Sequence, residues 1–201
     1  SVPIIKDIIR AYRIPILEVA GYEADDVIGT LATEAGKQGI KTYMMTPDKD
    51  YGQLVTDNVF MYRPKYGDKE FEVMGVEEIK AKFDIQSPAQ VIDMLGLMGD
   101  SADNIPGCPG VGEKTAQKLV AQFGSIENLL AHTDELKGAI KTKVESNKDQ
   151  IEFSKFLATI KVDVPITLNM EELSRKEPDE DELRRLFEEL EFRTLIDRVL
   201  K

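Results

Sequence analysis

Hydrophobic and polar positions in the first part of the chain alternate between helical and strand-like spacing. Intervals of three to four residues predict helices, and short β-branched runs bounded by proline, glycine or acidic residues predict strands. In order, these patterns predict a helix over 1–14, a strand over 15–19, a helix opening at 22–26, a strand over 40–46 and a short helix over 51–55. Both strands run directly into acidic residues that begin a helix. Because functional residues gather at the carboxyl ends of strands in open parallel sheets, this recurrence favours a site there.

The remainder of the chain is predicted to contain one strand pair followed by helices. The elements are strands over 58–63 and 69–74 joined by a turn over 64–68, helices over 75–83, 88–98, 114–123 and 126–131, further helices beyond residue 137, and an amphipathic pair over 178–201 after an acidic connector over 171–182. The fold class is therefore α/β, with a mostly parallel central sheet, flanking helices and a C-terminal helical region. We expect the α/β core to cover 1–103 and the helical region to cover 104–201.

Composition limits the class of protein. A chain of 201 residues with 42% hydrophobic content is long enough to bury a core. No apolar run approaches the length of a membrane span, the N-terminus has no signal-peptide pattern, and the single cysteine, Cys108, cannot form an internal disulfide. We therefore expect a cytoplasmic protein. The net charge of −11 argues against nucleic acid at first, but the acidic excess is concentrated in 1–103, where metal ions would neutralise it.

Three acidic clusters fall at the ends of predicted elements. The seven candidate catalytic and metal-binding carboxylates are Glu23, Asp25, Asp26, Asp48, Asp50, Asp100 and Asp103. Ordinary helix capping is a sufficient explanation for any one cluster taken alone. Mg²⁺, however, prefers oxygen ligands, and two divalent ions about 4 Å apart can activate water and stabilise the leaving oxygen of a phosphodiester. Seven carboxylates are enough for such a pair.

A glycine-rich turn separates two of the predicted helices. Gly107, Gly110 and Gly112 allow a tight turn and bring backbone N–H groups close to a phosphate. Helix, turn and helix together predict a hairpin. A nucleotide-binding loop is an alternative, but such a loop needs lysine directly after its second glycine and a strand before its first. Here Glu113 lies between Gly112 and Lys114, and the end of a predicted helix precedes the turn. The sequence therefore meets neither requirement of a nucleotide-binding loop.

Three motifs together resemble the flap-endonuclease family, and in particular the 5′-nuclease domains of bacterial DNA polymerases. They are Gly-Tyr-Glu-Ala-Asp-Asp over 21–26, Thr-Pro-Asp-Lys-Asp over 46–50 with Gln53-Leu54 behind it, and Gly-Asp-Ser-Ala-Asp-Asn-Ile-Pro-Gly-Cys-Pro-Gly-Val-Gly-Glu-Lys-Thr-Ala over 99–116. They occur in the family's order, and the resemblance covers essentially the whole chain. It implies a PIN-like, flap-endonuclease-like fold with a helix–three-turn–helix. It also implies 5′-3′ exonuclease and structure-specific 5′-flap endonuclease activity in replication and repair, including primer removal.

The resemblance implies roles for individual residues. Glu23, Asp25 and Asp26 would hold the first of two Mg²⁺ or Mn²⁺ ions, with Asp25 as a bridge, and the other four carboxylates would hold the second. The turn would grip duplex DNA and help to hold K⁺. The implied DNA-binding residues are Gly107, Gly110, Val111, Gly112, Lys114, Thr115 and Lys118. The implied partners are duplex DNA with a 5′ flap or nick and a covalently linked polymerase region, in a nucleoid-associated monomer.

The chain departs from the family pattern at its front. Family members begin with a strand that carries a further metal-binding aspartate, followed by a helical arch, and this sequence begins after both. We therefore expect the chain by itself to cleave DNA weakly or not at all. The alternative function is a duplex-DNA-binding module without chemistry, in which the hairpin binds and the acidic residues are structural.

Overall fold

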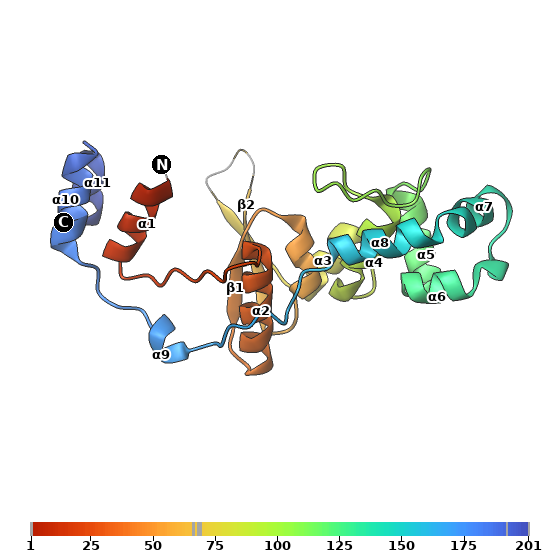
Figure 1. Cartoon of the computed structure of the whole chain (residues 1–201), viewed down its shortest axis with the longest axis horizontal. Coiled ribbons are helices and arrows are strands. Elements are labelled where there is room, and N and C mark those ends of the chain that lie inside the picture. Colours follow the sequence, from red (N-terminus) through yellow and green to blue (C-terminus); the bar gives the residue numbers. More distant parts are fainter. Residues whose placement is uncertain (1, 66, 68–69, 192, 201) are drawn as a thin grey trace. The chain divides into compact units, whose positions relative to one another are not determined.

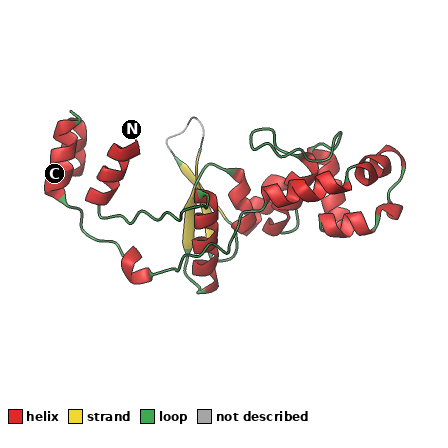
Figure 2. Ribbon diagram, viewed as in Figure 1, coloured by secondary structure: helices red, strands yellow, loops and turns green. Residues whose placement is uncertain are grey.

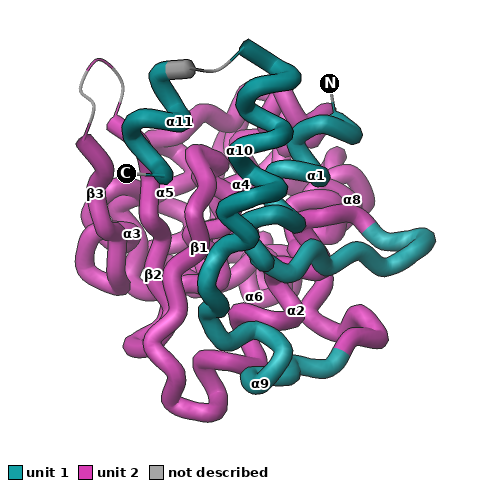
Figure 3. The backbone as a smooth tube through the Cα atoms, turned by 90° about the vertical axis from the view of Figure 1, so that its left-hand side faces the viewer, with its two compact units in different colours: residues 1–22, 167–201 teal, residues 23–166 magenta. Residues whose placement is uncertain are grey.

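The structure is a computed structural model of the chain that describes residues 2–65, 67, 70–191 and 193–200. Figure 1 shows the order of its elements, and Figure 2 shows that helices predominate over strands. The chain divides into two compact units, residues 23–166 and residues 1–22 with 167–201, which are distinguished by colour in Figure 3. Among the described residues, no helix is long and apolar enough to cross a membrane.

A small mixed sheet lies in the unit formed by residues 23–166. Its strands are β1 (Thr42–Met45), β2 (Val59–Pro64) and β3 (Phe71–Met74), in the order β1-β2-β3. β1 and β2 pair in parallel, with Thr42 opposite Val59, whereas β2 and β3 pair antiparallel. The sheet is therefore mixed rather than mostly parallel, because the short turn after β2 can return the chain only in the opposite direction. Parts of this predicted turn and of the predicted strand over 69–74 lie outside the described residues.

The strand predicted over 15–19 is wrong. These residues form an extended connection that pairs with none of the described strands. Pro15 has no N–H to donate to a sheet, and β-branched composition by itself provides no neighbouring strand.

Helices make up most of the same unit. They are α2 (Ala24–Lys37), α3 (Val76–Phe83), α4 (Val91–Met98), α5 (Glu113–Phe123), α6 (Ile126–Ala131), α7 (Gly138–Ser146) and α8 (Lys148–Ala158), with short 3-10 helices η1 (Lys49–Leu54), η2 (Pro88–Gln90) and η3 (Thr133–Glu135). The helices predicted from three- to four-residue spacing are confirmed within a few residues at each end. The predicted helix over 51–55 is a 3-10 helix that begins two residues earlier, directly after Asp48.

Helix α4 lies at the centre of the core. Val91, Met94 and Leu95 are completely buried, and α4 packs closely against α8. Gly96 makes this approach possible, because a Cβ atom there would lie 2.5 Å from the Ile126 side chain and 3.2 Å from the Lys155 backbone nitrogen. The interior around α4 is therefore shaped by the absence of a side chain at residue 96.

In the other unit, the regular structure of the described residues is helical. It contains α1 (Val2–Ala11), α9 (Met170–Leu173), α10 (Glu180–Glu189) and α11 (Arg193–Val199). Its small core consists of Ala11, Leu183, Leu186 and Phe187. The backbone N–H of Asp179 donates to the carbonyl of Ala11 at 2.7 Å, which ties the start of α10 to the end of α1. The predicted amphipathic pair is confirmed, but the predicted connector over 171–182 contains most of α9 and the start of α10.

Candidate metal centre

The first acidic cluster lies where α2 begins. Glu23 is the N-cap residue, but its exposed side chain makes no capping hydrogen bond, and Asp25 and Asp26 occupy the first turn. The carboxylate of Asp26 accepts a hydrogen bond from the backbone N–H of Lys161 at 2.9 Å. Asp25 accepts one from the Tyr51 hydroxyl at 2.5 Å. Helix capping therefore does not explain the presence of Glu23 at this position. Asp25 and Asp26 each form a hydrogen bond with a residue far away in the sequence.

The second cluster is built by η1. The side chain of Asp48 accepts from the backbone N–H of Asp50 at 2.9 Å, which starts the 3-10 turn and places both aspartates on its first residues. Asp103, from the loop after α4, joins them. One carboxylate oxygen from each of Asp48, Asp50 and Asp103 lies within 4.8 Å of the others. The structure thus brings two of the predicted clusters together.

Electrostatics favour a cation among these three carboxylates. Burial, followed by the negative charges of Asp48 and Asp103, raises the pKa of Asp50 to about 7. The pKa of Asp48 is raised for similar reasons, with Asp25 and Asp103 both contributing. Oδ1 of Asp50 is buried and is the single such side-chain atom in the described part of the chain without a hydrogen-bond partner. An orphaned carboxylate oxygen among like charges fits a divalent metal ion, which removes the charge repulsion and satisfies the oxygen.

Asp100 has a different partner. Its carboxylate forms an ion pair with the Lys49 ammonium at 2.6 Å, and its side chain is only 8% exposed. The hydrogen bond from Lys49 lowers the pKa of Asp100 against the opposing effect of burial. Asp100 and the exposed Glu23 are therefore not members of the three-carboxylate cluster.

Three residues around the carboxylates were given no role by the sequence patterns: Lys49, Tyr51 and Gln53. The Gln53 amide donates to the carbonyls of Asp50 and Ala158, at 2.9 Å and 2.8 Å, and its oxygen accepts from the backbone N–H of Ile160. Gln53 therefore ties the acidic loop to the end of α8. The motif over 46–50 located the acidic loop in the sequence. Hydrophobic spacing cannot predict the contacts of Gln53 with Ala158 and Ile160, because they join residues far apart in the chain.

The glycine turn lies between α4 and α5 and is fastened to α8. Gly107 has a φ of +66°, and a Cβ there would lie 2.7 Å from the Gly99 Cα, so the loop closes on itself only with glycine. The Ser154 hydroxyl accepts from the Gly107 N–H, and the Gln150 amide donates to its carbonyl, both at 2.9 Å. The predicted hairpin is therefore present, and α8 holds its loop.

The predicted DNA-contacting residues divide by burial. Gly107 and Val111 are buried, and Thr115 is half-buried. The exposed members are Gly110, Gly112, Lys114 and Lys118. Lys143, from α7, donates to the Gly110 carbonyl at 3.4 Å and adds a cation at the turn. A positive, exposed turn at the start of an 11-residue helix can bind phosphate.

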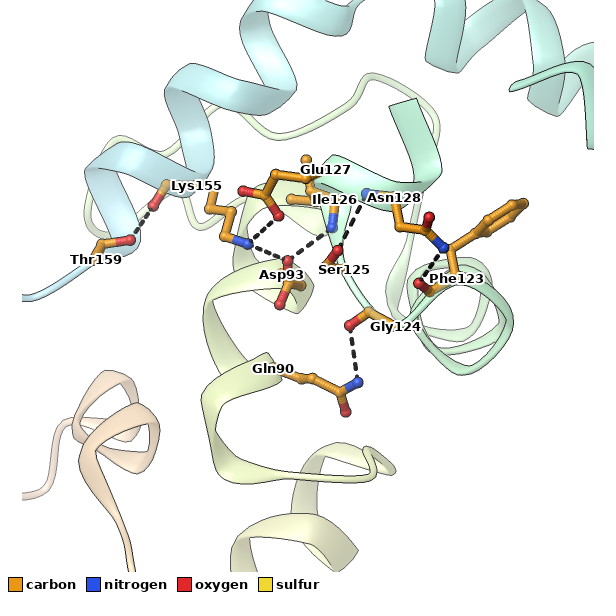
Figure 4. A network of polar contacts seen from close by, with 10 residues as sticks. All are labelled: Gln90, Asp93, Phe123, Gly124, Ser125, Ile126, Glu127, Asn128, Lys155 and Thr159. Carbon is orange, nitrogen blue, oxygen red and sulfur yellow. Dashed lines mark hydrogen bonds and ion pairs between the residues drawn. The ribbon is translucent and has the colours of Figure 1, made fainter. Parts of the chain in front are cut away.

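A polar network centred on the buried Asp93 holds α4, the first helix of the hairpin, to α6 and α8. Figure 4 shows Asp93 accepting from the Ile126 N–H at 2.9 Å and from the Lys155 ammonium at 2.6 Å. Lys155 also pairs with Glu127 at 2.7 Å, and the Gln90 amide donates to the Gly124 carbonyl. Helices α4, α6 and α8 are thereby fixed relative to one another.

Comparisons with known proteins identify the family of the chain. The family model described as 5′-3′ exonuclease, N-terminal resolvase-like domain, matches residues 1–84, and the one described as 5′-3′ exonuclease, C-terminal SAM fold, matches residues 86–181. A 5′-3′ exonuclease of Aquifex aeolicus (strain VF5) is 38% identical over 201 residues, with 100% of this chain and 67% of the relative covered. DNA polymerase I of Bacillus subtilis (strain 168) is 44% identical over 200 residues, with 99% of this chain and 23% of the relative covered.

Solved structures show the same fold. The T5 5′-exonuclease with bound zinc ions matches with a TM-score of 0.63 at 20% identity, over 89% of this chain and 62% of that one. The catalytic core of Rad2 in complex with DNA substrate matches with a TM-score of 0.62 at 17% identity, over 94% of this chain and 63% of that one. The chain spans 22% to 24% of the length of the DNA polymerase I relatives that it matches. The flap-endonuclease-like α/β fold with a helical C-terminal region is thus confirmed.

Proposed function

Because the chain belongs to the 5′-3′ exonuclease family, we propose that it is the metal-dependent nuclease part of a DNA polymerase I-type protein. In this proposal it hydrolyses phosphodiesters at a 5′ flap or nick in duplex DNA during replication and repair. The observation that carries the proposal is the buried, unpartnered Oδ1 of Asp50 beside Asp48 and Asp103. Burying a carboxylate oxygen without a partner costs free energy of folding, which a purely structural cluster of acids would not recover. The same arrangement suits a divalent cation, because such an ion binds carboxylate oxygens.

The proposed ligands are the seven carboxylates in two sets. Glu23, Asp25 and Asp26 would hold one Mg²⁺ or Mn²⁺ ion. The second set is Asp48, Asp50, Asp100 and Asp103. When bound, the ions activate water and stabilise charge on the leaving oxygen. The support differs between residues, since Asp48, Asp50 and Asp103 converge, whereas Lys49 already neutralises Asp100.

The proposed substrate contact is the hairpin. Exposed Gly110 and Gly112 would present backbone to duplex phosphates, Lys114 and Lys118 would add charge, and K⁺ would bind at the same turn. Gly107 and Val111, which are buried, would shape the turn from inside. The T5 flap endonuclease has been crystallised with DNA and metal ions, which supports DNA as the partner of this fold.

The test is a labelled 5′-flap duplex in Mg²⁺ and potassium, with binding and cleavage followed together. In a longer version of the chain that carries the N-terminal residues of its relatives, Asp48→Asn and Asp103→Asn are expected to reduce cleavage by about 100-fold or more while DNA binding is kept, because they remove ligands of the metal and leave the hairpin intact. Asp57→Asn, an exposed carboxylate outside the cluster, is the matched control. Unchanged cleavage in both ligand variants would contradict the proposal.

The 201-residue chain is to be compared with a longer version that carries the N-terminal residues of its relatives. Weak cleavage by the shorter chain stays a prediction. DNA binding by both, with cleavage by neither under any metal, would favour the module without chemistry.

A further inference from the structure

Tyr51 connects the core to the candidate metal centre. It follows Asp50 in η1, and its ring is packed in the hydrophobic core with only 2% of the residue exposed. Its hydroxyl donates to Oδ1 of Asp25 at 2.5 Å. Asp25 itself is exposed on the first turn of α2. A single buried side chain therefore reaches from η1, which carries one acidic cluster, to the helix that carries another.

Because the Tyr51 ring is buried and fixed, its hydroxyl limits the orientations that the exposed Asp25 carboxylate can adopt. An unconstrained aspartate at a helix start samples several rotamers, and a metal ion must then offset the lost side-chain entropy. Here the hydroxyl of a fixed ring engages one oxygen of Asp25 and leaves the other oxygen as a ligand. The phenolic O–H is the donor of this hydrogen bond, because a carboxylate oxygen can only accept.

Lys49 and Tyr51 act differently on their carboxylate partners. The Lys49 ammonium neutralises Asp100, so it competes with a cation for that carboxylate. The Tyr51 hydroxyl orients Asp25 without cancelling its charge. Neutral donors that orient a charged ligand are typical of the residues behind metal ligands.

We propose that Tyr51 is a positioning residue for metal binding. Its hydroxyl fixes the orientation of the Asp25 carboxylate relative to the Asp48 and Asp50 carboxylates. The inference rests on the proposed two-metal function. Phenylalanine would fill the same space in the core, so the hydroxyl serves Asp25 and the ring serves packing. Tyr51→Phe removes only the hydroxyl oxygen, so it tests the contact with Asp25 while the ring still packs in the core.

The first experiment measures Mn²⁺ binding to the 201-residue chain by electron paramagnetic resonance, without DNA. Tyr51→Phe is expected to weaken binding of the ion near Asp25 by about 10-fold or more, the usual cost of losing a group behind a ligand. Tyr62→Phe is the matched control, because Tyr62 lies on β2 and stacks on Phe71 at 4.7 Å. Circular dichroism and thermal unfolding in EDTA establish that each variant is folded.

A double-mutant cycle separates positioning from packing. If the hydroxyl acts through Asp25, Tyr51→Phe should have little further effect on Mn²⁺ affinity in an Asp25→Asn background. Additive losses would mean that Tyr51 acts by another route and would overturn the inference.

A second measurement does not depend on the folding of Tyr51→Phe. The chain contains no tryptophan, so its near-ultraviolet difference spectrum on Mn²⁺ addition reports tyrosines. The parent should give a tyrosine signal that Asp25→Asn reduces, and a signal equal in both would overturn the inference. If the parent binds Mn²⁺ and Tyr51→Phe binds it equally well, only the positioning role fails. If the parent binds no Mn²⁺, the proposed metal site fails and the positioning role fails with it.

Discussion

At the scale of single residues, Asp50 is distinguished by a carboxylate charge that the surrounding protein groups do not satisfy. Its neighbours within the cluster are two further carboxylates, and one of its oxygens has no hydrogen-bond partner. Burying charge in this way costs free energy of folding, and proteins retain such costs at functional sites. The same residue should therefore destabilise the metal-free chain and be needed by the metal-bound one.

The sign of the pH dependence follows from the raised pKa of Asp50. The folded state holds its proton up to about pH 7, whereas an unfolded aspartate loses it near its ordinary value of 3.8. The stability of the metal-free chain should thus fall as the pH rises from about 4 to 7, and remain low above that. Asp50→Asn removes this dependence. At pH 8 in EDTA it should raise the free energy of unfolding by on the order of 1 to 4 kcal/mol, measured by urea denaturation.

Two comparisons check this prediction. At pH 4.5 the parent and Asp50→Asn should differ much less than at pH 8, because only the first part of the pH-dependent loss of stability has then occurred. With saturating Mn²⁺ at pH 8 the advantage of the variant should shrink or reverse. A variant that is less stable than the parent at pH 8 in EDTA would show that the Asp50 carboxylate stabilises the fold.

At the scale of elements, the hairpin depends on buried polar contacts as well as on its glycines. Asp93 is 4% exposed and satisfies both the first N–H of α6 and the ammonium of Lys155 on α8. The three helices meet around that one carboxylate (Figure 4). Removing it leaves an N–H and a largely buried ammonium with fewer partners.

Asp93→Ala should therefore destabilise the chain by about 3–5 kcal/mol, the range found when one partner of a buried ion pair is removed. Asp93→Asn, which keeps an acceptor for the Ile126 N–H, should lose less. Asp149→Ala, an exposed acid on α8, is the control and should change stability by at most about 0.5 kcal/mol. Equal urea midpoints for Asp93→Ala and Asp149→Ala would refute this account of the hairpin.

Local pattern predicted the elements better than it predicted their contacts. The helices were predictable because a buried face repeats every three to four residues. The strand over 15–19 was not, because strand formation depends on a partner that composition does not reveal. Gln53 contacts residues 105 and 107 positions away, and the Asp26 to Lys161 hydrogen bond spans 135. The motifs located the acidic clusters, but the convergence of Asp48, Asp50 and Asp103, and the separate pairing of Asp100, required the fold.

At the scale of the whole molecule, all seven candidate carboxylates lie in the unit formed by residues 23–166. A divalent ion should therefore stabilise that unit by mass action. At an ion concentration 100 times the Kd, one site adds about 2.7 kcal/mol to the free energy of unfolding.

Hydrogen exchange with and without Mn²⁺ locates this effect. Slower exchange is expected at the start of α2, in η1 and in the loop after α4, because these segments carry the ligands. Peptides from α10, which carries none of them, serve as the internal reference. Protection confined to α10 would contradict the assignment of the metal to the carboxylates.

Helix α8 links two sites that act on the same substrate in the proposed function. Gln150 and Ser154 hold the hairpin at Gly107, and the carbonyl of Ala158 holds Gln53 beside Asp50. The eight residue-to-residue steps of α-helix from Gln150 to Ala158 extend for about 12 Å. In the proposed function, the length of α8 therefore contributes to the spacing between the hairpin turn at Gly107 and the acidic loop at Asp50. A change of one residue in α8 would alter that spacing by about 1.5 Å and turn one attachment by about 100° relative to the other. Under the proposed function, we expect such a change to move the position of the cut on DNA.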